Sequence, residues 1–298
     1  MNFTTHNAAG YMSSSHITPF HDSVTGTMTY IIADPATKRA AIIDPVLNYD
    51  ASSGRTSTTL ADAVLAAVRQ QGLTVEWILE THVHADHLTA AAYLKAQTNA
   101  KVAIGAEIVV VQKTFGTLFN LLATIKPLAG DFDRTFRDGE NFAIGNLPAR
   151  VIHTPGHTPA CVSYLIGDAV FVGDTIFMPD YGTARCDFPG GDAATLFSST
   201  QKILSLPEAT RIFVGHDYGP GGRPIAWETT VAAEKKSNIH IGGAVSVEEF
   251  VKMRTARDKT LPLPNLILPS VQVNIHAGNM PAKEANGISY LKMPLNAF

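Results

Sequence analysis

One short stretch, residues 80–88 (ETHVHADHL), places three histidines and an aspartate within six positions. These residues are His82, His84, Asp86 and His87. Borderline metals such as zinc and iron favour imidazole and carboxylate ligands together. A chance cluster of surface or core histidines is the alternative, but four such groups rarely come so close by chance. The stretch therefore predicts a metal site. Its spacing directs His82 and His84 toward one centre and Asp86 and His87 toward a neighbouring one, which allows one ion or two.

Three further ligand candidates follow apolar segments. His157 lies in the turn of VIHTPGHTPACV, Asp174 follows AVFVG, and His216 follows RIFVG. Taken alone, Asp174 would be an ordinary turn or cap residue and His216 an ordinary loop histidine. Their repeated placement behind strand-like segments favours one shared site, because a scaffold positions the loops at its strand ends rigidly. His153 is expected to shape its turn instead.

Strands must position these candidates, and the pattern of apolar residues predicts them. Alternating or continuous apolar runs indicate strands, whereas helical spacing bounded by capping residues indicates helices. Strands are expected at 26–34, 39–45, 74–82, 101–105, 142–144, 150–153, 160–166, 169–172 and 210–215, and helices at 56–72, 88–100, 106–125 and 192–204. Without a polar linker, this order favours one layered α/β domain spanning 1–298. Residues from about 240 to 298 are expected to form a C-terminal extension.

The composition is that of a globular protein, with 45% hydrophobic and 16% charged residues. A net charge of −3 gives no reason to expect nucleic acid or an anionic membrane as a partner. The two cysteines, Cys161 and Cys186, make no disulfide framework and suggest a reducing compartment. No apolar run approaches the roughly 18 residues of a membrane span, and the first twenty residues lack the pattern of a signal peptide. A cytoplasmic location is therefore expected.

The combination of HxHxDH, TPGHT, GD and GHDY resembles the metallo-β-lactamase superfamily over residues 27–218. This resemblance implies a four-layer αββα sandwich with a metal site at one edge, between the two sheets. In the hydrolases of this superfamily the matching residues hold two ions bridged by the residue that matches Asp174. One ion would take His82, His84 and His157, and the other would take the remaining three candidates.

Other segments resemble the persulfide dioxygenases within that superfamily. They include TGTMTYIIADPATKRAAIIDPVL, ARCDFPGGDA and the EEFVKM…LPLP tail. This resemblance implies one Fe(II) per chain, held by His82, His157 and Asp174. Two histidines and a carboxylate leave iron positions open for other ligands, as in non-haem Fe(II) oxygenases. The other four candidates would hydrogen-bond and orient these ligands; they are His84, Asp86, His87 and His216.

The same resemblance implies glutathione persulfide and O₂ as substrates and sulfite and glutathione as products, in sulfide detoxification. A homodimer is one compatible assembly. The alternative enzyme is a glyoxalase-II-like hydrolase of glutathione thioesters with two metal ions. The helical glutathione-binding domain usual in that family is not evident in this sequence. A third hypothesis is a non-catalytic metal-binding or redox-sensing module that uses Cys186.

Substrate contacts are also implied by resemblance. Arg185 matches a substrate-contacting arginine, and its planar fork suits a carboxylate of glutathione. An ion pair with Asp187 has equal weight, and both roles can hold if Asp187 orients Arg185. Tyr218 matches an active-site tyrosine whose hydroxyl would bond the substrate sulfur or a metal-bound ligand; a buried structural tyrosine is the alternative. Cys161 is expected to be a small buried hydrophobe, and Cys186 is a candidate for a lowered pKa and oxidation.

Overall fold

Two six-stranded sheets form the centre of the computed structural model, which describes residues 15–125 and 130–297. The first sheet has the order β1-β2-β3-β6-β8-β9, with strands β1 (His16–His21), β2 (Met28–Ala33), β3 (Arg39–Ile43), β6 (Thr74–Leu79), β8 (Lys101–Gly105) and β9 (Arg134–Phe136). The second has the order β10-β11-β12-β13-β14-β15, with strands β10 (Asn141–Ile144), β11 (Leu147–His153), β12 (Val162–Ile166), β13 (Ala169–Phe171), β14 (Arg211–Phe213) and β15 (Glu228–Thr230). A small third sheet joins β5 (Arg55–Ser57), β4 (Val46–Asp50) and β7 (Leu88–Thr89).

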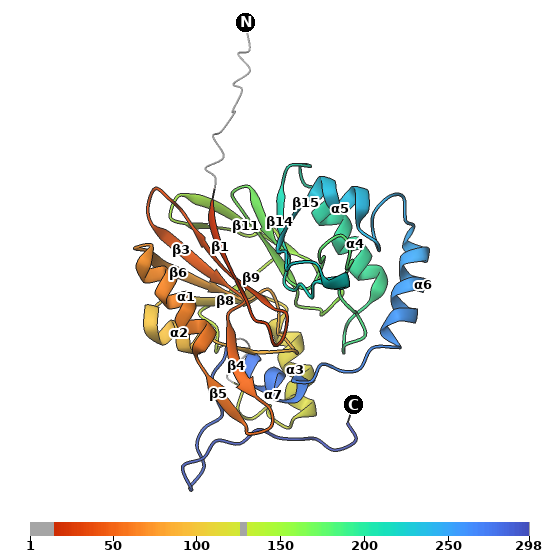
Figure 1. Ribbon diagram of the computed structural model, residues 1–298. Coiled ribbons are helices and arrows are strands. Elements are labelled where there is room, and N and C mark those ends of the chain that lie inside the picture. The colour runs from red at the N-terminus through yellow and green to blue at the C-terminus, as the bar shows by residue number, and fades with distance from the viewer. Residues whose placement is uncertain (1–14, 126–129, 298) are drawn as a thin grey trace, which may run out of the picture.

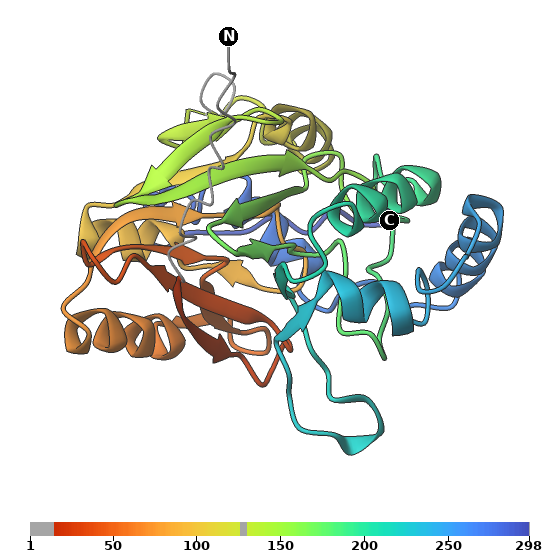
Figure 2. The same cartoon turned by 90° about the horizontal axis from the view of Figure 1, so that it is seen from above.

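Helices cover the outer faces of both large sheets (Figures 1 and 2). The first sheet is covered by α1 (Thr59–Gln70), α2 (Ala91–Thr98), α3 (Ile108–Leu118) and α7 (Ile267–Asn274). The second is covered by α4 (Ala193–Leu204), α5 (Val231–Ser237) and α6 (Val247–Asp258), and a short 3₁₀ turn occupies Pro220–Gly222. This arrangement confirms the expected αββα sandwich.

Three apolar layers hold the sandwich together. Along β2, the side chain of Ile31 packs against the helices, whereas Tyr30 and Ile32 pack between the two sheets. This alternation follows from the period of two along a strand. A third layer, which includes Val170 and Leu196, lies between the second sheet and its helices. Each sheet is therefore buried on both faces, which explains why its strands read as nearly continuous apolar runs.

Parallel strand pairs bring the predicted ligands to one edge. In the first sheet β6 runs parallel to β3 and β8, and in the second β13 runs parallel to β14. The carboxyl ends of parallel neighbours meet at the same edge of a sheet. The segments that follow β6, β13 and β14 carry His82, Asp174 and His216, respectively. The topology thus collects residues that are far apart in sequence.

The predicted helices are shorter in the structure at several ends. The helix expected at 106–125 ends at Leu118, and Asn120 adopts a left-handed backbone conformation with φ 52°. Such a residue terminates a helix because the chain can no longer continue its hydrogen-bond ladder. The helix expected from Asp192 begins as predicted. The carboxylate of Asp192 caps it by accepting a hydrogen bond of 2.7 Å from the Thr195 N–H.

The segment from about residue 240 contributes to the same layers as the rest of the chain. Helix α6 packs on α4, and α7 packs on α3 and β7. Val271 and Val273 are buried in the layer outside the first sheet. The expected absence of a leader rested on the first twenty residues, of which the first fourteen lie outside the described part of the chain.

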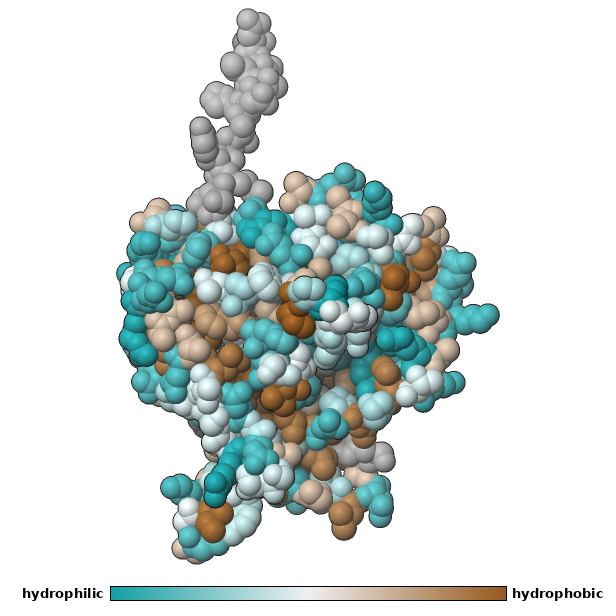
Figure 3. All heavy atoms as spheres, viewed as in Figure 1, coloured by the Kyte–Doolittle hydropathy of each residue, from teal (hydrophilic) through white to brown (hydrophobic). Residues whose placement is uncertain are grey.

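None of the helices in the described residues is long and apolar enough to cross a membrane. On the face drawn in Figure 3, hydrophobic side chains are interspersed with hydrophilic ones.

A buried ion pair gives a test of how α6 is anchored. The Arg254 guanidinium, 1% exposed, donates to the Asp258 carboxylate at 2.8 Å and to the Thr183 carbonyl at 3.1 Å. We expect Asp258→Ala to lower the free energy of unfolding by about 3–5 kcal/mol, because it leaves a buried cation without its anion. Urea unfolding measures this change. The exposed Lys252 on the same helix is the control, and Lys252→Ala should change stability by less than about 0.5 kcal/mol. Equal effects of the two substitutions would contradict the assignment.

Candidate metal centre

The structure brings His82, His157 and Asp174 together. His82 follows β6, His157 lies in the turn between β11 and β12, and Asp174 follows β13. One ligand atom from each lies within 4.8 Å of the others. His157 Nε2 is 3.5 Å from Asp174 Oδ2, and the ring centroids of His82 and His157 are 5.0 Å apart. These are the three residues that the resemblance assigns to a single iron.

Hydrogen bonds fix which nitrogen of His82 faces the site. The Thr81 hydroxyl donates its one proton to Asp44 Oδ2 at 2.8 Å. It therefore accepts at its 3.0 Å contact with His82 Nδ1, so this nitrogen must carry the proton. His82 Nε2 is left with a lone pair that is buried and has no hydrogen-bond partner. Burial and the neighbouring histidines hold the pKa of His82 well below its usual value, which keeps that lone pair free.

Two other histidines are oriented in the same way. His157 Nδ1 donates to the Arg185 carbonyl at 2.7 Å, which leaves Nε2 facing Asp174. His87 Nδ1 donates to the Leu88 carbonyl at 3.0 Å, and His87 Nε2 has no hydrogen-bond partner. Buried polar atoms without partners are costly unless a ligand satisfies them. Several inward lone pairs, each fixed by a hydrogen bond at the far side of the ring, fit a bound metal cation.

His84 has a different environment from its neighbours. Its Nε2 lies 3.1 Å from Asp44 Oδ1 and 3.3 Å from Glu80 Oε2. Burial opposes the charged ring, but the two carboxylates prevail and raise the pKa of His84 well above its usual value. Burial raises the pKa of Glu80, whose Oε1 accepts a hydrogen bond from the Thr89 hydroxyl. One face of His84 is therefore committed to acidic groups, and only Nδ1 remains for a metal.

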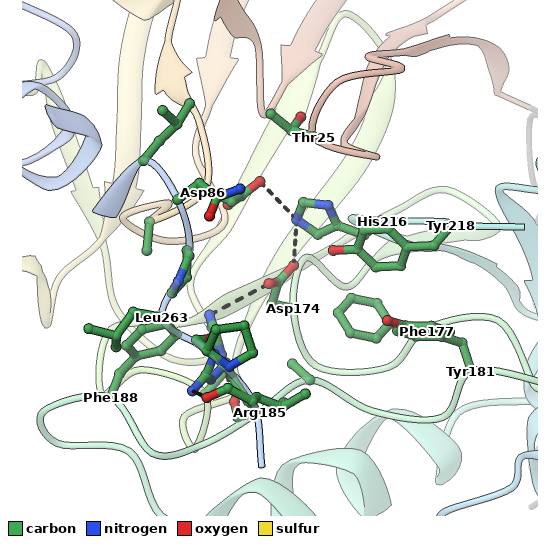
Figure 4. Close-up of a pocket in the computed structure, with 18 of the residues that line it drawn as sticks. Thr25, Asp86, Asp174, Phe177, Tyr181, Arg185, Phe188, His216, Tyr218 and Leu263 are labelled. Carbon is green, nitrogen blue, oxygen red and sulfur yellow. Dashed lines mark hydrogen bonds and ion pairs between the residues drawn. The ribbon is translucent and has the colours of Figure 1, made fainter. Parts of the chain in front are cut away.

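Asp86 and His216 border the first group (Figure 4). His216 Nε2 is 3.3 Å from Asp174 Oδ1 and 3.6 Å from Asp86 Oδ2. Thr27 donates to Asp86 Oδ2 at 3.1 Å. Burial opposes the charged carboxylate, but His216 and His87 lower the pKa of Asp86. His84, Asp86 and His87 form a second group whose ligand atoms lie within 4.8 Å of one another, so the geometry accommodates either one ion or two.

Asn274, which the sequence analysis missed, fixes the backbone of the histidine cluster. Its side-chain amide donates to the carbonyls of His84 and His87, both at 2.8 Å. Its oxygen accepts from the Thr89 N–H at 2.8 Å. Asn274 is 3% exposed and is the last residue of α7. It lies 190 positions from His84 along the chain. No local pattern marks an asparagine for this role.

Asp44 and Glu80 were also missed, because the strands expected at 39–45 and 74–82 contained them. In the structure each directly follows its strand, β3 or β6, so an acidic residue at the end of an apolar run was the signal that could have identified both. Asp44 accepts from the Thr81 N–H at 2.7 Å in addition to the Thr81 hydroxyl. It therefore positions His82 through Thr81 and His84 directly.

A cavity of about 790 Å³ opens beside these groups. His157, Asp174 and His216 line it, and Phe177, Tyr181 and Phe188 contribute aromatic walls. Leu263 borders it from the C-terminal segment (Figure 4). This volume is typical of sites for small molecules.

Tyr218 lines the same cavity. It is 48% exposed, so the alternative of a buried structural tyrosine is wrong. Its ring is parallel to that of His216, at an interplanar angle of 2° and a centroid distance of 5.8 Å. The side chain is thus placed beside the metal-binding groups and open to the cavity.

Arg185 forms the expected ion pair and two further contacts. Its Nε and Nη2 donate to Asp187 at 2.6 and 2.8 Å. Nη1 donates to the Pro262 carbonyl at 2.5 Å, and Nη2 approaches the Leu261 carbonyl at 3.5 Å. The guanidinium therefore links the cavity wall to the C-terminal segment. These four contacts occupy most of its five N–H donors.

The two cysteines are buried and not activated. Burial raises the pKa of Cys161 to about 12. Burial and the carboxylate of Asp258, 3.3 Å from its sulfur, raise the pKa of Cys186 to about 12. The lowered pKa considered for Cys186 is therefore wrong, because the nearest hydrogen-bonded charge is negative and Arg185 is engaged elsewhere. His153 Nε2 donates to the Pro159 carbonyl at 2.9 Å, consistent with shaping its turn.

Comparison with known proteins gives matches over nearly the whole chain. The family model described as the metallo-β-lactamase superfamily matches residues 23–216. The "Glyoxylase B2" of Dictyostelium discoideum is 57% identical over 280 residues, covering 93% of this chain and 95% of that protein. A "Beta-lactamase hydrolase-like protein" of Xylella fastidiosa is 54% identical over 96% of this chain, which spans only 66% of that relative.

Persulfide dioxygenases are more distant relatives. The human mitochondrial "Persulfide dioxygenase ETHE1" is 30% identical over 261 residues, covering 86% of each chain. Among solved structures, ETHE1 from Myxococcus xanthus matches with a TM-score of 0.71 and 33% identity, covering 89% of this chain and all of that one.

The contacts of Asn274 allow a direct test. We expect Asn274→Leu to weaken metal binding about 10- to 100-fold, because the carbonyls of His84 and His87 lose the donor that fixes the loop. Competition with a chelator measures the affinity. Gln272, 2% exposed on the same helix, binds the Leu268 and Lys292 backbones instead and is the matched control. An equal loss of affinity in Gln272→Leu would show that α7 acts only through general stability.

The raised pKa values predict unreactive thiols. At pH 8 a thiol with a pKa of about 12 is a thiolate in only roughly one molecule in ten thousand, and only the thiolate is alkylated. We therefore expect iodoacetamide to leave both cysteines unmodified in the folded protein and to label both in urea, as read by mass spectrometry. Rapid labelling of native Cys186 would contradict the assigned environment.

Proposed function

Because the chain belongs to the metallo-β-lactamase superfamily, we propose that it is a persulfide dioxygenase with one Fe(II) per chain. It would convert glutathione persulfide, O₂ and water to glutathione and sulfite, with release of two protons. The four electrons lost by the terminal sulfur are accepted by O₂. The observation that carries this proposal is the group formed by His82, His157 and Asp174. Two histidines and one carboxylate are the ligand set of non-haem Fe(II) oxygenases.

The residues of this chain have separable roles in the proposed reaction. His82 and His157 would hold the metal through Nε2, since each Nδ1 is occupied by a hydrogen bond to Thr81 and to the Arg185 carbonyl, respectively. Asp174 would supply the carboxylate. Fe(II) bound there would supply the redox chemistry that O₂ activation requires and that Zn(II) lacks. The cavity beside this group would hold the two reactants close together, which makes their reaction effectively intramolecular.

The size and lining of the cavity favour a thiol-bearing substrate of peptide size. Phe177, Tyr181 and Phe188 supply apolar walls that limit the access of water to the reacting sulfur. The Tyr218 hydroxyl is proposed to hydrogen-bond that sulfur. Relatives named persulfide dioxygenase, 30% identical in the human case, match 86% of the chain and lend further support.

A second candidate is a glyoxalase-II-like hydrolase of glutathione thioesters with two metal ions. It is favoured by the second group of ligand atoms, from His84, Asp86 and His87, and by the name of the Dictyostelium relative. The contacts of His84 Nε2 with Asp44 and Glu80 leave only Nδ1 of this ring for the second ion.

Metal content and O₂ consumption separate the two candidates. For protein purified without O₂, we expect about one iron per chain, O₂ uptake with glutathione persulfide, and sulfite as product. We expect Asp174→Asn to lose the iron and His87→Asn to retain one iron per chain, because Asp174, unlike His87, belongs to the proposed iron-binding group. Two metal ions per chain, no O₂ uptake and hydrolysis of S-lactoylglutathione would refute the dioxygenase and support the hydrolase.

A further inference from the structure

We propose that Arg257 on α6 binds a carboxylate of the substrate and makes the site selective for carboxylate-bearing persulfides such as that of glutathione; this inference rests on the proposed function. The metal-binding groups would hold the sulfur end, while α6 would hold the far end. The argument depends on which cations of the cavity are still free to bind an anion.

Three arginines line the cavity within the described residues, namely Arg185, Arg254 and Arg257. Arg185 gives its Nε and one Nη2 proton to Asp187, and further donors to the Pro262 and Leu261 carbonyls. At most one of its five N–H groups is left. It cannot offer the pair of parallel donors that a bidentate carboxylate contact requires.

The guanidinium of Arg254 is even less available to a substrate than that of Arg185. It is 1% exposed, its Nε and Nη2 contact the Asp258 carboxylate, and its Nη1 donates to the Thr183 carbonyl. A substrate carboxylate at Arg254 would have to displace a buried carboxylate. Breaking such a pair leaves a buried charge uncompensated and is strongly unfavourable.

Arg257 lies three positions further along α6, on the same side of the helix as Arg254. It is exposed and lines the cavity. Its side chain makes no hydrogen bond or ion pair with any residue in the described parts of the chain, so all five donors are available. A planar guanidinium with free donors is well suited to a carboxylate.

The other charges of the cavity favour one orientation of the substrate. The acidic side chains that line it are Asp50, Asp86 and Asp174. Asp50 belongs to the β4–β5 hairpin, and the other two border the candidate metal centre. A substrate carboxylate is repelled at these positions and attracted to Arg257. The sulfur is then left to face the metal-binding residues.

The test compares two persulfides in steady-state O₂ uptake by the iron-loaded enzyme: glutathione persulfide and 2-mercaptoethanol persulfide, which has no carboxylate. The quantity measured is the ratio of their kcat/KM values. We expect Arg257→Gln to lower this ratio about tenfold, mainly through KM for glutathione persulfide, and Arg257→Lys to restore part of it. Lys252, exposed on the same helix and outside the cavity, is the matched control, and Lys252→Gln should leave the ratio unchanged.

An unchanged ratio in Arg257→Gln, or an equal fall in Lys252→Gln, would overturn the inference. Calorimetric titration of the same proteins with glutathione tests it without turnover, and Arg257→Gln should raise the Kd about tenfold. If the wild-type enzyme consumes no O₂ with either persulfide but loses glutathione affinity in Arg257→Gln, the dioxygenase proposal fails and the role of Arg257 stands. Glutathione binding that is absent, or unaffected by the substitution, rejects the role of Arg257.

Discussion

The buried carboxylate of Asp44 is the group on which the geometry of the site depends. It accepts two hydrogen bonds from Thr81 and lies against His84 Nε2. Because a buried charge must be compensated, these contacts fix the backbone at the end of β6 and the orientation of two rings. Through Thr81, the same carboxylate determines which nitrogen of His82 faces the site. The parallel pairing of β3 with β6 makes this contact possible by ending both strands at one edge.

The C-terminal segment contributes contacts both to the histidine cluster and to the cavity. Asn274 binds the backbone of the histidine cluster from outside, Asp258 anchors the segment that carries Cys186, and residues 261–266 border the cavity. Arg185 joins that border to the second sheet's loops through the Pro262 carbonyl. The metal-binding groups and the substrate cavity are therefore shaped together with α6 and α7.

Relatives named persulfide dioxygenase and glyoxylase both match most of this chain, and two groups of ligand atoms lie side by side in it. His82, His157 and Asp174 form one group, while His84, Asp86 and His87 form another beside it. Within the second group, the surrounding carboxylates determine which nitrogen of His84 is left for a metal. In this chain Asp44 and Glu80 draw His84 Nε2 away, and Asp86 is paired with His216 and Thr27.

Local patterns in the sequence predicted a layered α/β domain and the candidate ligands, and the resemblance to the metallo-β-lactamase superfamily implied the αββα arrangement. Apolar runs defined the strands, and His or Asp directly after a run marked the edge where loops meet. The sequence did not identify Asn274, the shared role of Asp44, or the free guanidinium of Arg257. These depend on contacts between segments up to 190 residues apart. The raised pKa of Cys186 is a similar case: its neighbour Arg185 suggested a cation, but folding placed the Asp258 carboxylate against the sulfur instead. Which charged groups face each other depends on the folded arrangement, because side chains compete for partners that are distant in the sequence.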